Sequence, residues 1–178
     1  FAETLLPLIA DNPEDAIAPA TELLETFPET FSRYWHDGLA HRLGLSTHVD
    51  GDDVLANDLM QLLQERRLDL ISTMRSLSAH LRGDDIGLDD WTTRWESRLQ
   101  LENATSEELI QRLDAINPIY VPRNHLVEEA LAQAVAGDLD PFMQMLERVT
   151  HPYERVAGAD RFAEPGDPAP GYRTYCGT

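Results

Sequence analysis

Leucine and aromatic residues recur at spacings of three and four along nearly the whole chain, and this period is that of one face of an α-helix. A representative stretch contains Phe31, Tyr34, Trp35, Leu39 and Leu43. No alternation of polar and apolar residues runs long enough to indicate a strand. The spacing therefore predicts an all-α protein with an array of about eight helices.

Capping residues, Pro and Gly predict where these helices begin and end. Asn12-Pro13-Glu14-Asp15 combines a capping side chain, a Pro for the first turn and acids at the positive end of the helix dipole. Thr105-Ser106-Glu107-Glu108 fits a capping box. Gly44, Gly83 and Gly137 follow apolar stripes at positions typical of helix C-caps.

Two segments depart from the helical pattern. Asn117–Pro122 holds two prolines with apolar residues between them, which favours an extended strap. From Thr150 onward, Pro and Gly are too frequent for regular structure. We therefore expect a helical region over residues 1–149 and an irregular tail over residues 150–178. The tail is either disordered or laid over another surface.

The charge of the chain excludes some partners and some chemistry. Its 178 residues carry 32 acidic and 14 basic side chains, a net charge of −18, and every basic residue is Arg. Such a surface repels phosphate backbones and anionic lipid, so neither nucleic acid nor a membrane is an expected partner. The absence of Lys removes the Schiff-base amine and the lysine that holds ATP phosphates in kinases. No leader peptide and no membrane-spanning run of apolar residues is expected.

Arg123-Asn124-His125 is the most notable polar group, because it follows the strap and opens a helix. The Asn124 side chain could cap that helix, and the Arg123 fork could clamp a carboxylate or a phosphate. A cap together with a structural ion pair is the favoured interpretation, and a ligand site is the alternative.

Other constellations indicate structure more than chemistry. Trp91 and Trp95 share one helix face and could stack on a planar ring, although packing in a core is the favoured use. His36 and His41 are five residues apart, about 140° around a helix, which is unsuited to a shared metal. No acidic stretch fits a calcium loop, and no phosphate loop or nucleophile–base pair is recognisable. The residues by themselves show no complete active site.

Cys176 is the only cysteine and lies near the C-terminus. A thiol on a free end can react with a distant partner, and any disulfide partner would lie outside this chain. The alternative is an inert cysteine that falls near the end by chance.

Several stretches, in the same order and with similar spacing, resemble the C-terminal part of the selenoprotein O family. They are Asn117–His125, Val127–Ala130, Gly137-Asp138, Pro152-Tyr153 and Tyr172–Thr178, and two upstream stretches, Phe1–Ile9 and Trp35–Leu45, also look like that family. The resemblance is strong over Asn117–His125 and at the terminus, and weak between Gly51 and Glu102. The resemblance implies protein adenylyltransferases with a kinase-like fold, which transfer AMP from ATP to Ser, Thr or Tyr hydroxyls of target proteins with Mg²⁺ or Mn²⁺. It also implies a bacterial, cytoplasmic protein.

The same resemblance implies that the residues for ATP, metal and catalysis lie in an N-terminal portion, so none is carried over to this chain and no cofactor is expected on it. Cys176 matches a terminal thiol or selenol that is thought to pair with a cysteine near the catalytic region, as a redox control. Under this hypothesis the chain is structural and regulatory, its apolar face covers the missing portion, and alone it would self-associate. The other hypothesis is an independent helical binding module that uses a groove near Trp91, Trp95 and Arg123.

Overall fold

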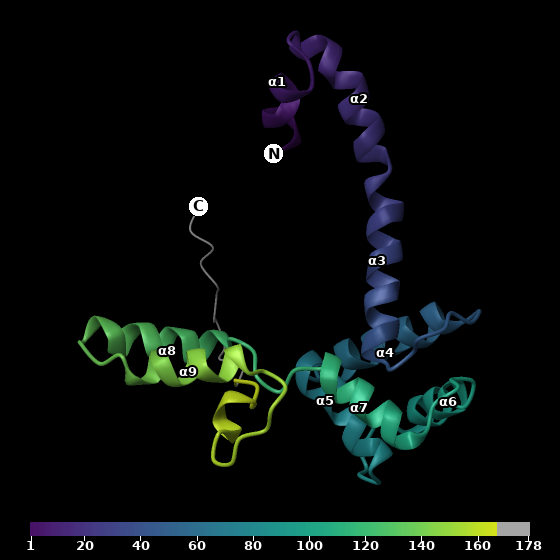
Figure 1. The fold of residues 1–178 in the computed structure, drawn as a ribbon, viewed down its shortest axis with the longest axis vertical. Helices are drawn as coiled ribbons and strands as arrows, with labels where there is room; N and C mark the ends of the chain where they lie inside the picture. The colour runs from purple at the N-terminus through teal and green to yellow at the C-terminus, as the bar shows by residue number, and fades with distance from the viewer. Residues whose placement is uncertain (167–178) are drawn as a thin grey trace. The chain divides into compact units, whose positions relative to one another are not determined.

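The structure, a computed structural model, describes residues 1–166 apart from the side chain of Asp89. Its elements in chain order (Figure 1) are η1 Ala2–Leu5, α1 Leu6–Ile9, α2 Pro13–Glu25, α3 Phe27–Arg42, α4 Asp52–Arg66, α5 Leu70–Leu81, α6 Asp89–Leu99, α7 Ser106–Ile116, α8 Asn124–Val135, α9 Asp140–Thr150 and η2 Asp160–Phe162. Eight α-helices within the described residues have 11 or more residues, and no strand occurs there. The predicted all-α fold is therefore confirmed.

The predicted helix ends are confirmed at several positions. Asn12 caps α2 by accepting from the Glu14 N–H, and Thr105 and Glu108 form the full capping box of α7. Gly44, Gly83 and Gly137 have φ of 82°, 107° and 94°, the left-handed region that favours Gly.

The predicted cap of α8 is wrong. Asn124 is already the first helical residue, Arg123 occupies the N-cap position, and the structure shows no side-chain cap bond at this helix end. The prolines of the strap hold the chain extended up to Arg123, so the helix starts one residue earlier than an Asn124 cap would require.

The chain divides into two compact units, Phe1–Ala40 and His41–Thr178. In the first unit α1 packs on α2, and α3 follows α2 after Thr26. Among residues 1–40 the buried hydrophobic side chains are those of Ala16 and Leu39. The helices of this unit thus have almost no core of their own.

The second unit has a core drawn from α4 to α7, the loops between them and the segment that follows α3. Its most fully buried side chains include Leu43, Leu59, Met74, Leu77, Trp95 and Leu113. Trp91 and Trp95 stack with ring centroids 5.8 Å apart, and their indole N–H groups donate to the Leu55 and Leu43 carbonyls at 2.9 Å. The favoured core use of these tryptophans is confirmed.

A buried ionic network joins α4 to α6 inside this core. The Arg98 guanidinium donates to both carboxylate oxygens of Asp52, at 2.6 and 3.1 Å, and to Glu102 at 3.0 Å. Glu102 also accepts from the Ser46 N–H and the Thr47 hydroxyl, at 3.0 and 2.8 Å. The hydroxyl and guanidinium donors satisfy the charges, which is the condition for burying them.

α8 and α9 form a helical hairpin whose inner face buries Leu126, Ala130 and Met145. Within residues 1–166, none of the helices combines the length and the apolar character that crossing a bilayer requires.

Candidate functional site

The segment after α9 covers the strap and turns it into a clasp, which we define as residues 117–123 and 151–166. The backbone N–H groups of Ile119 and Tyr120 both donate to the Pro152 carbonyl, at 2.7 and 3.2 Å. The Tyr120 hydroxyl accepts from the Val156 N–H at 3.0 Å. Ile119 and Tyr120 are buried with Ala159, so this part of the tail lies over another surface, the second of the two alternatives.

Arg123 holds the clasp to the start of α5. Its guanidinium donates to both carboxylate oxygens of Asp69 at 2.7 and 2.8 Å, and to the Ala163 carbonyl at 3.1 Å. Asp69 in turn caps α5 by accepting from the Ser72 N–H at 2.8 Å. The hydrogen bonds from Arg123 hold the pKa of Asp69 far below its usual range, and the bonds from Ser72 act in the same direction.

The three residues of the Arg123-Asn124-His125 group have different surroundings. Arg123 is largely buried at the clasp, whereas Asn124 and His125 lie exposed in the first turn of α8. Gly166 lies directly against the His125 imidazole ring, and a Cβ added at Gly166 would overlap that ring. Cys176 lies outside the described residues.

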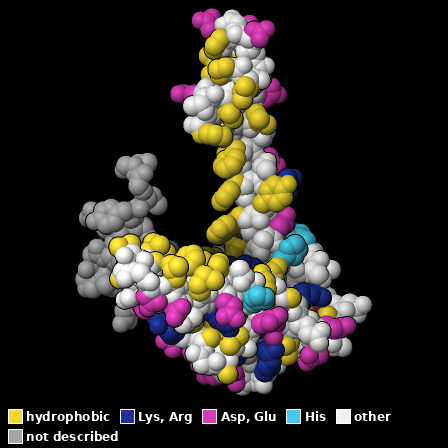
Figure 2. Space-filling model, turned by 60° about the vertical axis from the view of Figure 1, so that its left-hand side comes forward, with side chains coloured by type: hydrophobic (Ala, Val, Ile, Leu, Met, Phe, Trp, Pro, Cys, Tyr) yellow, Lys and Arg dark blue, Asp and Glu magenta, His cyan; other side chains and the backbone are white. Residues whose placement is uncertain are grey.

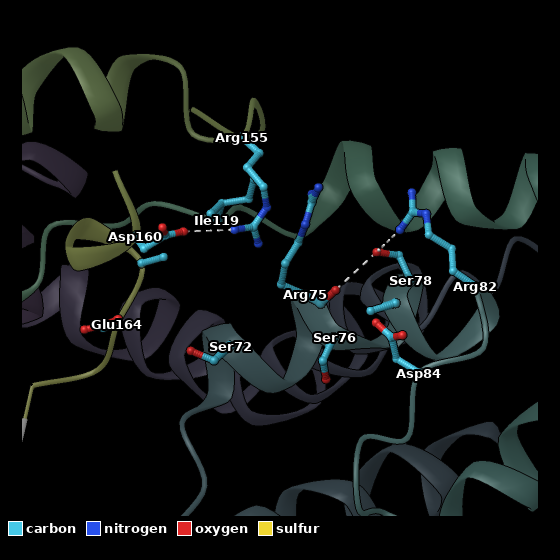
Figure 3. A pocket seen from close by; sticks show the side chains of 12 residues that line it. Ser72, Arg75, Ser76, Ser78, Arg82, Asp84, Ile119, Arg155, Asp160 and Glu164 are labelled. Carbon is cyan, nitrogen blue, oxygen red and sulfur yellow. Dashed lines mark hydrogen bonds and ion pairs between the residues drawn. The ribbon is translucent and has the colours of Figure 1, made fainter. Parts of the chain in front are cut away.

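A cavity of about 630 Å³, lined mainly by polar residues, lies next to the clasp, between α5 and the segment 155–164 (Figure 3). The lining residues are Ser72, Arg75, Ser76, Ser78, Ala79, Arg82, Asp84, Ile119, Arg155, Asp160, Ala163 and Glu164. Ser72 and Ala163 also contact Arg123, so the cavity and the clasp are continuous.

The arginines of this cavity are already paired. Arg75 donates to the Asp114 and Asn117 carbonyls at 2.8 and 3.0 Å and forms an ion pair with the Asp114 carboxylate at 3.1 Å. Arg82 pairs with the same carboxylate, and Arg155 lies 3.3 Å from Asp160. Burial alone would raise the pKa of Asp114, but hydrogen bonds and the two arginines outweigh it, so its pKa is lowered and it stays ionised.

The chemistry available in this cavity is hydrogen bonding. Three arginines face three acidic residues, Asp84, Asp160 and Glu164, so the lining has no excess of positive charge to select an anion. Within residues 1–166, no three His, Cys, Asp or Glu side chains gather as they would to hold a metal ion. The bonds of Arg123 to Asp69 and to the Ala163 carbonyl thus hold residues 151–166 against the start of α5.

Sequence reasoning missed the α5 side of this site. Ser72, Arg75, Ser76, Ala79 and Arg82 recur at spacings of three and four, so they lie on one helix face. That polar stripe, beside the apolar stripe through Met74 and Leu77, was the available signal.

The model of a family described as "Protein adenylyltransferase SelO" matches residues 1–150. The chain belongs to this family. The resemblance seen in the sequence is therefore confirmed.

Curated relatives in the SelO family extend the match to the whole chain. Proteins named "Protein nucleotidyltransferase YdiU" from Mycolicibacterium paratuberculosis, Geobacillus kaustophilus and Mycolicibacterium smegmatis are 40%, 38% and 40% identical, each over 100% of this chain. The chain covers only 38%, 38% and 36% of their lengths. The family match contains the strap and Arg123 but ends at residue 150, before the tail part of the clasp.

Proposed function

We propose that this chain is the C-terminal helical part of a protein adenylyltransferase with a kinase-like fold. One observation carries the proposal: the whole chain aligns with just over a third of the length of each relative named nucleotidyltransferase. These relatives belong to a family described as protein adenylyltransferase. The reaction transfers AMP from ATP to a Ser, Thr or Tyr hydroxyl of a target protein in the bacterial cytoplasm. Mg²⁺ or Mn²⁺ supplies charge neutralisation at the phosphates.

The part of the protein outside this chain carries the nucleotide and metal ligands in this proposal. The absence of Lys from the chain supports this division, because phosphate-binding lysines are a recurring part of kinase-like sites. The role of the present chain is structural: the Arg98 network and the Arg123 clasp hold its second unit rigid.

Cys176 adds a regulatory role. It lies ten positions after Gly166, the last described residue, so its thiol stays within about 35 Å of that point. We propose that a two-electron oxidant such as hydrogen peroxide joins this thiol to a cysteine of the remaining polypeptide, and that the disulfide changes transfer activity.

The described residues 1–166 argue against an independent binding module. The groove that it needs would use Trp91, Trp95 and Arg123, but both tryptophans are at most 3% exposed and Arg123 is engaged with Asp69. We therefore do not retain this second hypothesis.

The proposal is tested with the full-length protein and ATP labelled in the α-phosphate. Labelled AMP is expected to appear on protein side chains with the full-length protein, and not with the 178-residue chain alone. Transfer by the chain alone, or none by the full-length protein with either metal, would overturn the proposal. The Cys176→Ser variant is expected to keep its transfer activity after peroxide treatment, whereas the wild type changes and is restored by dithiothreitol.

A further inference from the structure

An unbroken apolar seam runs along α2 and α3 in the first unit. Its positions alternate in steps of three and four residues: Ile17, Ala20, Leu24, Phe27, Phe31, Tyr34 and Gly38. This is the heptad spacing of helices that pack lengthwise against other helices. The seam spans both helices, although Thr26 separates them.

Most of the seam is exposed, and Ala20 is half-buried. Ile17 and Leu24 are each 53% exposed, Phe27 is 62%, Phe31 is 54% and Tyr34 is 67%. Figure 2 shows hydrophobic side chains following one another along these helices. Soluble monomers rarely expose a continuous apolar strip, and such a strip is typical of an interaction surface.

The rings of Phe27 and Phe31 in the seam, and of Trp35 beside it, are ordered in advance. The rings of Phe27 and Phe31 stack with centroids 5.9 Å apart, and those of Phe31 and Trp35 with centroids 6.1 Å apart. Stacked rings on one helix face lose little side-chain freedom on docking. Short helices also require tertiary packing to be stable, and this unit buries little besides Ala16 and Leu39.

The residues beside the seam argue against a second copy of the chain as the occupant. In the heptad notation the seam residues occupy positions a and d, and the positions that flank them are e and g. In helical dimers, charged residues at e and g select the partner. Here most of those positions hold uncharged residues, namely Ala16, Thr21, Leu23, Pro28, Thr30 and Trp35. Leu23 and Trp35 widen the apolar face instead, so it fits a broad groove better than a single helix.

Charge gives a second argument. Residues 1–40 contain one basic side chain, Arg33, and the acids Glu3, Asp11, Glu14, Asp15, Glu22, Glu25, Glu29 and Asp37. Two such units would repel one another if they paired along their lengths. Glu22 and Glu29 lie on the helix face opposite the seam, where they stay in water when the seam is covered.

We propose that the seam docks into an apolar groove on the part of the same polypeptide that lies outside this chain. The larger share of each relative's length lies outside the aligned region. A further part of the same polypeptide is therefore available to cover the seam. The inference rests on the proposed function only in treating the chain as part of a longer protein. It adds which residues dock and the chemistry of the groove.

Hydroxyl-radical footprinting tests the docking without any variant. In the full-length protein, oxidation of Phe27, Phe31 and Trp35 is expected to fall to the level of buried Trp95, while the isolated chain is oxidised readily at these positions. Equal oxidation of the seam in both proteins would overturn the proposal. So would protection that appears only as the isolated chain dimerises and that the full-length monomer lacks.

A matched pair of variants then tests the groove. Phe31→Glu places a charge in the seam, and Ser32→Glu places the same charge on an adjacent, exposed position outside it. In the full-length protein, Phe31→Glu is expected to lower the melting temperature and restore oxidation at Phe27, whereas Ser32→Glu changes neither. Identical behaviour of the two variants would contradict docking, whatever the transfer assay shows. Seam protection without AMP transfer would refute only the proposed activity.

Discussion

Glu102 allows a quantitative test of the buried network. Burial by itself raises the pKa of this carboxyl, but hydrogen bonds from Ser46, Thr47 and Arg98 outweigh it and lower the pKa from 4.5 to about 2. The side chain is 1% exposed, so solvent screening is small. At 1.36 kcal/mol per pKa unit, the ionised group contributes about 3 kcal/mol to the free energy of unfolding above pH 4.5. Removing one partner of a buried ion pair costs a similar amount, about 3–5 kcal/mol.

The direction of the pH dependence follows from the lowered pKa. Between pH 4.5 and pH 2 the unfolded chain binds a proton at Glu102 that the folded chain does not, so this contribution decreases as pH falls through that range. Glu102→Gln is therefore expected to lower the free energy of unfolding by about 3 kcal/mol at pH 7. At pH 3.5 the difference from the wild type is expected to be smaller by about 1 kcal/mol.

Urea unfolding followed by the fluorescence of Trp91 and Trp95 measures this difference, because both indoles are buried in the second unit. Glu154→Gln is the matched control, since Glu154 is exposed and no side-chain bond is shown for it among residues 1–166. The control is expected to match the wild type at both pH values. If the deficit of Glu102→Gln is the same at pH 7 and pH 3.5, ionisation of Glu102 is not its cause and the reasoning fails.

Three further predictions concern the clasp and the core. Arg123→Met removes the guanidinium that joins Asp69 to the tail. Trypsin is therefore expected to cut within residues 151–166 faster than in the wild type. An unchanged digestion rate would show that Arg123 does not hold the clasp. Trp95→Phe leaves the buried Leu43 carbonyl without its donor and is expected to lower the free energy of unfolding in urea by about 2 kcal/mol. A loss below half of that would argue against the bond. Gly44→Ala places a Cβ on a residue with φ 82°, a conformation that strains any residue other than Gly. It is expected to lower the free energy of unfolding in urea by about 1–2 kcal/mol, and full wild-type stability would contradict this backbone strain.

The helices themselves could be predicted because their signals are local. The apolar spacing, the Asn12 cap and the Thr105–Glu108 capping box involve residues within a few positions of each other, and all are present in the structure. The wrong prediction at Asn124 arose where the preceding prolines competed with a capping side chain.

The partners of the charged residues could not be predicted, because they are far apart in the chain. Arg98 meets Asp52 across 46 positions, and Arg123 meets Asp69 across 54. In the sequence each of these arginines is one of 14 with 32 acids to choose from. Only the packing of α6 against α4, and of the clasp against the start of α5, selects the pairs.

By itself, the sequence determined the helical class, most helix ends and the family, since helix periodicity, caps and motif order are all written along the chain. The tertiary structure decided which charges are buried together, that the tail part of the clasp covers the strap, and that the seam of α2 and α3 is left exposed. These outcomes depend on contacts between distant segments, and the free energy of such contacts comes from desolvation and geometry that no local pattern specifies.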